Sequence, residues 1–201
     1  MRNAFAKELS NIAQKNKKIV LLSGDIGNRL FDNFRKNFPT RFHNCGIAEA
    51  SMTGIASGLA HLGLRPITYT IATFNTIRCL EQIKLDVCYP NLPVIIVGTG
   101  AGLSYSSLGS THHSIEDIAL LRSIPNLSIL CPSDPEEVKK LLDDAIKLNG
   151  PVYLRLGKKN EPVVESRRKI GKSNIIVNGK NNLIISVGNI LIEAINASKK
   201  L

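Results

Sequence analysis

The sequence predicts an α/β fold in which a parallel sheet is covered by helices on both faces. Short runs rich in β-branched residues alternate with helical patterns along the chain. Several of these runs are apolar throughout, and polar or small residues follow four of them. Strands that are apolar on both sides are typical of a parallel sheet buried between two helical layers.

The expected elements follow one another closely. An amphipathic helix is expected from residue 1, and the strands that follow it are predicted over 18–23, 41–44, 66–71, 93–97, 127–130 and 152–156. Helices are expected between them, near 30–38, 47–62, 75–89, 115–123 and 134–148. The helix over 47–62 has apolar and small residues on every side, as a helix buried within a domain does. Together these elements predict one domain over residues 1–158.

The last part of the chain has a different composition. Residues 159–181 are polar and basic, which predicts a linker. Residues 182–188 predict one strand, and residues 191–201 predict one helix. Because a single βα unit cannot bury its own apolar face, we interpret 182–201 as the start of a second, incomplete domain.

Composition narrows the class of protein. No apolar run approaches 18 residues and the N-terminus lacks a signal-peptide core, so we expect a cytoplasmic protein that does not enter a membrane. The formal net charge is +10, but the basic residues are spread out and aromatics make up only 5%, which disfavours nucleic-acid binding. An anionic small substrate or an acidic partner fits this charge. The four cysteines lack metal-ligand spacing, so free thiols and no metal site are expected.

Four polar or small segments follow expected strands, at 24–28, 44–49, 72–74 and 98–113. Ligands of parallel sheets bind beyond the carboxyl ends of the strands. These segments are therefore predicted to cluster at one edge and to form the functional site.

Glu49 is the single acid in an otherwise uncharged run from 45 to 60. In the first turn of a helix, a carboxylate gains about 0.3–1 kcal/mol from the helix dipole. The dipole does not explain the apolar surroundings, where a carboxyl group costs free energy unless it is paired or protonated. Glu49 is therefore either a helix-start residue or a group that exchanges a proton with a ligand nitrogen.

Two further side chains carry alternative interpretations. Phe74 directly follows an expected strand, so it is either a core aromatic or a surface on which a flat ligand stacks. His112 and His113 lie in the long loop 98–113. Adjacent histidines cannot share one helix face, which disfavours a paired metal site, but a histidine in a loop of this length is able to move protons near neutral pH.

Five segments together resemble a known family. In chain order they are "GDIG" (24–27), "RFHNCGIAEASMTGIASGLAHLGLRP" (41–66), "TFNTIRCLEQIKLDVCYPNLPV" (73–94), "AGLSYSSLGSTHHSIEDIALLRSIPN" (101–126) and "PSDPEE" (132–137). They resemble the pyrimidine-binding domain of thiamine-diphosphate enzymes, in the transketolase and deoxyxylulose-phosphate synthase group. The pattern F-x-x-x-R-x-x-E-Q from Phe74 to Gln82 looks most like the separate C-terminal subunit of split transketolases.

The resemblance implies roles for the candidate residues. Glu49, in "GIAE", matches the glutamate that hydrogen-bonds the pyrimidine N1′ of the cofactor, and Phe74 matches the aromatic that stacks on that ring. His112 matches the active-site histidine near the donor substrate. Asp25 matches an acid at the cofactor site, and Arg155 and Lys158 lie where related enzymes hold substrate phosphate.

Three departures from the family pattern affect the expected activity. The chain lacks the G-D-G motif that holds the cofactor diphosphate and its Mg²⁺, so the resemblance implies a partner subunit that supplies it. Leu108 replaces an acid that reads the acceptor sugar in several transketolases, and Gly100 lies near the position of a second loop histidine. The residues for the donor half of the reaction are therefore present, while those for the acceptor half are not all found.

The resulting hypothesis is a subunit of a transketolase that transfers a two-carbon ketol unit between sugar phosphates. The resemblance implies a dimer of this chain within a heterotetramer that includes a diphosphate-binding N-terminal subunit. The alternatives are a subunit like deoxyxylulose-phosphate synthase, a subunit like the β chain of 2-oxo-acid dehydrogenases, and a non-catalytic fragment.

Overall fold

A computed structural model describes residues 1–158, 161–164 and 170–201. Six parallel strands form one sheet in the order β2-β1-β3-β4-β6-β5. The strands are β1 (Ile19–Ser23), β2 (Phe42–Asn44), β3 (Arg65–Ile71), β4 (Ile95–Thr99), β5 (Ser128–Leu130) and β6 (Val152–Leu156). Each lies within about two residues of its predicted range, and the all-parallel sheet confirms the predicted fold class.

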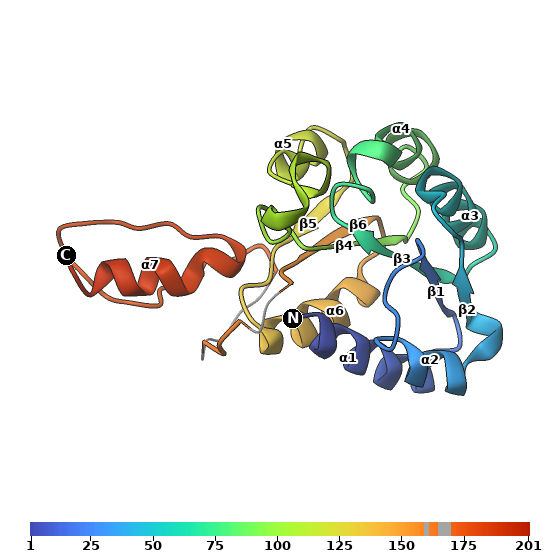
Figure 1. Cartoon of the computed structure of the whole chain (residues 1–201), viewed down its shortest axis with the longest axis horizontal. Coiled ribbons are helices and arrows are strands. Elements are labelled where there is room, and N and C mark those ends of the chain that lie inside the picture. Colours follow the sequence, from blue (N-terminus) through green and yellow to red (C-terminus); the bar gives the residue numbers. More distant parts are fainter. Residues whose placement is uncertain (159–160, 165–169) are drawn as a thin grey trace.

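Helices cover both faces of the sheet (Figure 1). One layer contains α1 (Arg2–Lys15), α2 (Asp32–Asn37) and α6 (Pro135–Lys147). The other contains α3 (Glu49–His61), α4 (Leu80–Gln82) and α5 (Asp117–Leu121). Short 3₁₀ turns occupy Pro39–Arg41, Ile77–Cys79, Ser106–Leu108, Ser110–His112 and Gly188–Ile190.

Two apolar cores lie on opposite faces of the sheet because successive strand residues point to opposite sides. In β1, Ile19 and Leu21 belong to the core under α1, α2 and α6, whereas Val20 and Leu22 belong to the core under α3. The central strands β1, β3 and β4 are buried along their whole length. Within the described ranges, no helix combines the length and apolarity needed to cross a bilayer.

The helix expected over 75–89 is replaced by a broken helical segment. A 3₁₀ turn, Ile77–Cys79, leads into the single turn α4 and then into a π-helical stretch, Ile83–Cys88. The side chain of Asn75, just before this segment, donates hydrogen bonds to Thr68 Oγ1 at 3.1 Å and Val97 O at 2.9 Å. The start of the segment is thus tied to β3 and β4, a long-range contact that apolar spacing does not reveal.

The C-terminal region is only partly as expected. The helix is present as α7 (Leu191–Ser198), but residues 182–187 form no strand. The side chains of Leu183 and Ile185 are 84% and 82% exposed, and the segment projects from the main body (Figure 1). A strand forms only when a neighbour satisfies its backbone groups, and no neighbouring strand is described here. Of the expected linker, residues 159–160 and 165–169 lie outside the described residues.

Candidate active site

The parallel register brings the ends of the central strands to one edge of the sheet. Ser23 of β1 is paired with Asn44 of β2 and Tyr69 of β3, and Ile71 of β3 is paired with Thr99 of β4. The segments that follow these strands therefore meet, as the sequence predicted. A side chain placed on Gly24 would lie 3.3 Å from Glu49 Cγ, and the rings of Phe74 and His112 lie 5.1 Å apart.

Glu49 is the first residue of α3, and its side chain is only 2% exposed. Its Oε2 accepts a hydrogen bond from Arg78 Nη1 at 2.6 Å. Of the two states that allow a carboxyl group to be buried, paired or protonated, the structure therefore contains the paired one. Arg78 is not among the residues predicted for the site, although it is the arginine of the F-x-x-x-R pattern that begins at Phe74.

Phe74 is half-buried and has polar neighbours around its ring. The guanidinium carbon of Arg78 lies 4.4 Å from the ring centroid, in a cation–π contact. His112 approaches the same ring edge-on, at 5.1 Å and an interplanar angle of 68°. The Phe74 ring is therefore contacted by both Arg78 and His112 at the edge of the sheet, and it belongs to neither apolar core.

His112 is held in the 3₁₀ turn Ser110–His112, which divides the loop expected over 98–113. The Thr111 hydroxyl and His112 Nδ1 are 3.0 Å apart, and the Tyr105 ring lies 6.1 Å from the imidazole. Leu108, at the end of the preceding turn, has half of its side chain exposed. The turn thus fixes the position of His112 at the same edge as Glu49 and Phe74.

Asp25 lies at the β1–β2 side of this edge and is exposed. Its backbone has a positive φ of 54°, a conformation that costs free energy for a residue other than glycine. Asn44 binds it twice, because the Asn44 amide donates to Asp25 Oδ1 at 3.0 Å and the Asp25 N–H donates to Asn44 Oδ1 at 3.2 Å. Its described hydrogen bonds therefore link the loop after β1 to the end of β2.

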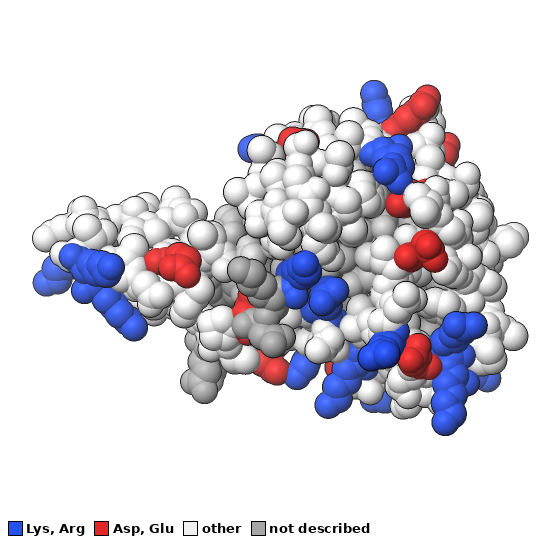
Figure 2. Space-filling model, viewed as in Figure 1, with Lys and Arg blue, Asp and Glu red and all other residues white. Residues whose placement is uncertain are grey.

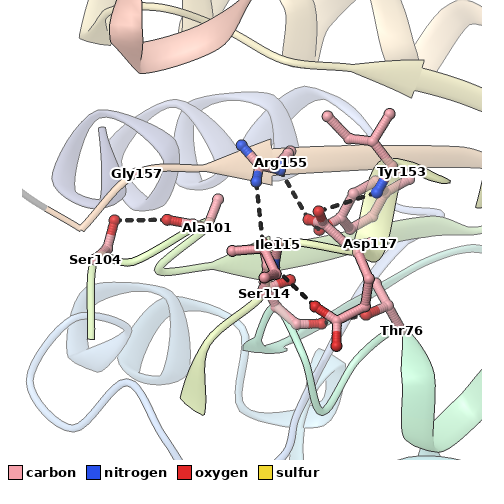
Figure 3. A network of polar contacts seen from close by, with 12 residues as sticks. Thr76, Ala101, Ser104, Ser114, Ile115, Asp117, Tyr153, Arg155 and Gly157 are labelled. Carbon is pink, nitrogen blue, oxygen red and sulfur yellow. Dashed lines mark hydrogen bonds and ion pairs between the residues drawn. The ribbon is translucent and has the colours of Figure 1, made fainter. Parts of the chain in front are cut away.

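Arg155 takes part in a buried network (Figure 3). Its Nε donates to Asp117 Oδ2 at 2.8 Å, and its Nη2 donates to the Ser114 carbonyl at 3.1 Å. The Tyr153 hydroxyl donates to the same Asp117 oxygen at 2.8 Å. Burial disfavours the charged guanidinium, but the hydrogen bond and charge of Asp117 outweigh it and raise the pKa of Arg155. These contacts tie β6 to the base of the loop that carries His112.

Lys158 also contacts this loop. Its Nζ lies 4.0 Å from the centroid of the Tyr105 ring. Tyr105 itself is 8% exposed and packs so closely on Gly100 that a side chain at Gly100 would overlap the ring. Gly100 also has a positive φ of 76°, so the loop needs glycine near the position where the family pattern has a second histidine.

Charge is distributed unevenly over the surface. On the face in Figure 2, lysines and arginines lie in separate groups with acidic side chains between them, and a broad area without charged side chains adjoins them.

In the part of the chain that is described, no group of three or more His, Cys, Asp or Glu side chains is placed to hold a metal ion. Two cationic groups contact aromatic rings at this edge, Arg78 on Phe74 and Lys158 on Tyr105.

A comparison with known families identifies the domain that carries these residues. Residues 1–163 match the family described as "Transketolase, pyrimidine binding domain". The chain belongs to this family. The match covers all six strands and every candidate residue of the site.

Individual members of the transketolase family agree with this assignment. The chain is 36% identical over 205 residues to an apulose-4-phosphate transketolase subunit from Phocaeicola vulgatus, covering all of this chain and 66% of that protein. It is 36% identical to the 1-deoxy-D-xylulose-5-phosphate synthase of Carboxydothermus hydrogenoformans, over 98% of this chain and 32% of that protein. A solved split-gene transketolase, an inactive beta4 tetramer, has a TM-score of 0.88 and 37% identity, over 99% of this chain and 66% of that one.

Proposed function

We propose that this chain is the pyrimidine-binding subunit of a thiamine-diphosphate-dependent transketolase, which transfers a two-carbon ketol unit between sugar phosphates. The observation that carries the proposal is the buried Glu49 at the start of α3, in one contact cluster with Phe74 and His112. The relatives that are named as transketolase subunits support it.

The residues present fit an aminopyrimidine ring. Gly24 keeps side-chain atoms out of the region beside Glu49, because a Cβ there would lie 3.1 Å from Thr70 Oγ1 and 3.3 Å from Glu49 Cγ. The Thr70 hydroxyl is buried and lacks a hydrogen-bond partner within the described residues. In this proposal, Glu49 holds the proton that N1′ of the ring accepts, and Phe74 orients the ring by stacking. When bound, thiamine diphosphate supplies the electron sink for breaking the bond beside the ketose carbonyl.

The other candidates take roles around this pair. We assign His112 a proton transfer at an oxygen of the donor sugar, and Asp25 a contact to the cofactor at the rim. Lys158 is the better candidate for substrate phosphate. Arg155, to which the family resemblance gave the same role, already donates to Asp117 and Ser114, and this favours a positioning role for Arg155.

A second subunit completes the proposed site. We propose that an N-terminal transketolase subunit holds the diphosphate and its Mg²⁺, because no G-D-G motif occurs in this chain. The chain spans 66% of the first relative's length. We propose a dimer of this chain within a heterotetramer, located in the cytoplasm, where the four free cysteines would stay reduced.

A second candidate activity is that of a deoxyxylulose-phosphate synthase. The similarity to that enzyme extends over 98% of the chain. Leu108 also stands at the position where several transketolases have an acid. Donor preference separates the two candidates: a ketose phosphate would be cleaved by a transketolase, whereas pyruvate would be the donor of the synthase.

Replacing Glu49 by glutamine tests the proposed function. In a complex reconstituted with the diphosphate-binding subunit of a split transketolase, Glu49→Gln is expected to lower kcat by about 100-fold or more, because glutamine cannot exchange the proton. Glu136→Gln, at an exposed position of α6, is the matched control and is expected to keep wild-type kcat. Calorimetry with thiamine diphosphate and Mg²⁺ gives an independent measure of binding. Full activity of Glu49→Gln would disprove the proposal.

A further inference from the structure

Arg78 contacts both side chains that are proposed to bind the pyrimidine, Glu49 and Phe74. Its Nη1 lies 2.6 Å from Glu49 Oε2, and its guanidinium carbon lies 4.4 Å from the centroid of Phe74. A guanidinium is planar and carries several N–H donors, so it stacks and hydrogen-bonds as a flat heterocycle does. The Arg78 side chain therefore makes, within this chain, the same two kinds of contact that the aminopyrimidine is proposed to make.

The contact with Arg78 and the proposed contact with the pyrimidine require opposite charge states of the Glu49 carboxyl group. Arg78 at 2.6 Å stabilises the ionised carboxylate, whereas a hydrogen bond donated to N1′ requires a proton on Glu49. The adjacent Cys79 does not offset this, because burial raises the pKa of its thiol to about 11 and the thiol stays neutral. The Thr53 hydroxyl donates to the Glu49 backbone carbonyl at 3.0 Å and leaves the carboxyl group to Arg78. Among the described contacts, Arg78 is thus the charged group that pairs with the Glu49 carboxyl group.

The position of Arg78 allows its side chain to leave while the fold stays in place. The side chain is 43% exposed, in contrast to the 2% of Glu49. The turn that carries it is held by backbone hydrogen bonds from Ile77 to Thr73 at 3.1 Å and from Cys79 to Thr76 at 3.2 Å. Cys79 is fully buried and anchors the turn. Rotation about the arginine side-chain bonds therefore moves the guanidinium away from Glu49 and Phe74 without moving this turn.

We propose that Arg78 is a displaceable occupant of the pyrimidine site, which must release Glu49 and Phe74 before an aminopyrimidine binds. This inference rests on the proposed function. Arg78 keeps the buried carboxylate paired in the free subunit, and its departure is coupled to proton uptake by Glu49. Binding of the ring is thereby weakened by the free energy of the pair that it replaces.

Calorimetry of the reconstituted complex tests the inference. Thiamine diphosphate with Mg²⁺ is titrated at mildly alkaline pH, where the aminopyrimidine is neutral, in two buffers of different ionisation enthalpy. The wild type is expected to take up about one proton per site, because Glu49 passes from ionised to protonated. Arg78→Met is expected to bind about tenfold more tightly and to take up fewer protons, since the competing partner is gone.

Two matched variants control this measurement. Arg35→Met removes the same side chain from an exposed position of α2 and is expected to reproduce wild-type affinity and proton uptake. Arg78→Lys keeps the charge without the planar group and is expected to fall between the wild type and Arg78→Met. Circular dichroism of each variant verifies that it is folded.

The outcomes separate this inference from the proposed function. Weaker binding by Arg78→Met, or wild-type binding without proton uptake, would mean that Arg78 stays in place as a contact of the bound ring; the inference would fail while the proposed function stood. Wild-type proton uptake is informative even where Arg78→Met does not fold. Absence of wild-type binding would overturn both.

Discussion

Side chains of the site are held by charged partners from other parts of the chain. Glu49 is paired with Arg78, 29 residues away, and Asp117 is paired with Arg155, 38 residues away. The second pair is the more deeply buried, since Asp117 is inaccessible and the Arg155 side chain is 14% exposed. Removing one partner of such a pair leaves an uncompensated charge in the interior, which strongly destabilises the folded state.

Asp117→Asn is therefore expected to lower the free energy of unfolding by about 3 kcal/mol. Asparagine keeps the shape but removes the charge that Arg155 and the Tyr153 hydroxyl need. Urea denaturation measures the loss. Glu136→Gln, which breaks the exposed pair with Lys139, is the control and is expected to change stability by less than about 1 kcal/mol. Equal effects of the two substitutions would contradict the structural role of Asp117.

At the scale of elements, α6 begins with a complete set of local signals. Asp134 precedes Pro135, and its Oδ1 accepts a hydrogen bond from the Glu137 N–H at 2.7 Å. The Glu137 carboxylate in turn accepts from the Ser133 N–H at 2.7 Å. These contacts satisfy N–H groups at the start of the helix, which was expected to begin near residue 134. Asp134 also holds the chain after β6, because its Oδ2 accepts from the Val164 N–H at 3.0 Å.

Replacing Asp134 by alanine is expected to lower the free energy of unfolding by about 1–2 kcal/mol, because the N-cap bond is lost at a buried position. Thermal unfolding followed by circular dichroism measures this change. Asp143→Ala, on the exposed side of the same helix, supplies the comparison and is expected to shift stability by about 0.5 kcal/mol or less. A larger effect at Asp143 than at Asp134 would show that the cap is unimportant.

At the scale of the whole molecule, burial keeps several tyrosine and cysteine side chains neutral up to high pH. Burial raises the pKa of Tyr69 to about 12, of Cys79 to about 11, of Cys88 to about 12 and of Cys131 to about 11. Each group loses its proton more easily in the unfolded chain than in the folded one. Between the two pKa values the unfolded state binds fewer protons, so stability falls as pH rises.

The protein is therefore expected to lose stability above about pH 8.5, where unfolded cysteines ionise, and more steeply above about pH 10, where unfolded tyrosines do. Tyr69→Phe keeps the ring packed between Phe5 and Phe31. Relative to its own stability at neutral pH, it is expected to lose up to about 1.4 kcal/mol less per pH unit than the wild type above about pH 10. Urea denaturation across this range measures the slope. Tyr89→Phe, at an 85% exposed ring, should retain the wild-type slope, and identical slopes for both variants would refute the assignment to Tyr69.

Local patterns determined much of this protein. Short β-rich runs located the six strands, and the residues that follow them located Glu49, Phe74 and His112 at one edge, because the ends of parallel strands coincide. Periodicity and capping depend on neighbours within a few residues, so they are visible in the chain itself.

Only the tertiary structure decided which groups those side chains meet. The pairing of Glu49 with Arg78, the use of Arg155 by Asp117, the broken helix after β3 and the missing strand at 182–187 all depend on contacts between distant segments. A buried charge needs a partner and a strand needs a neighbour, but spacing along the chain does not say which distant residue arrives. Folding brought Arg78 onto Glu49 and Phe74, a contact that no local pattern in the sequence predicts.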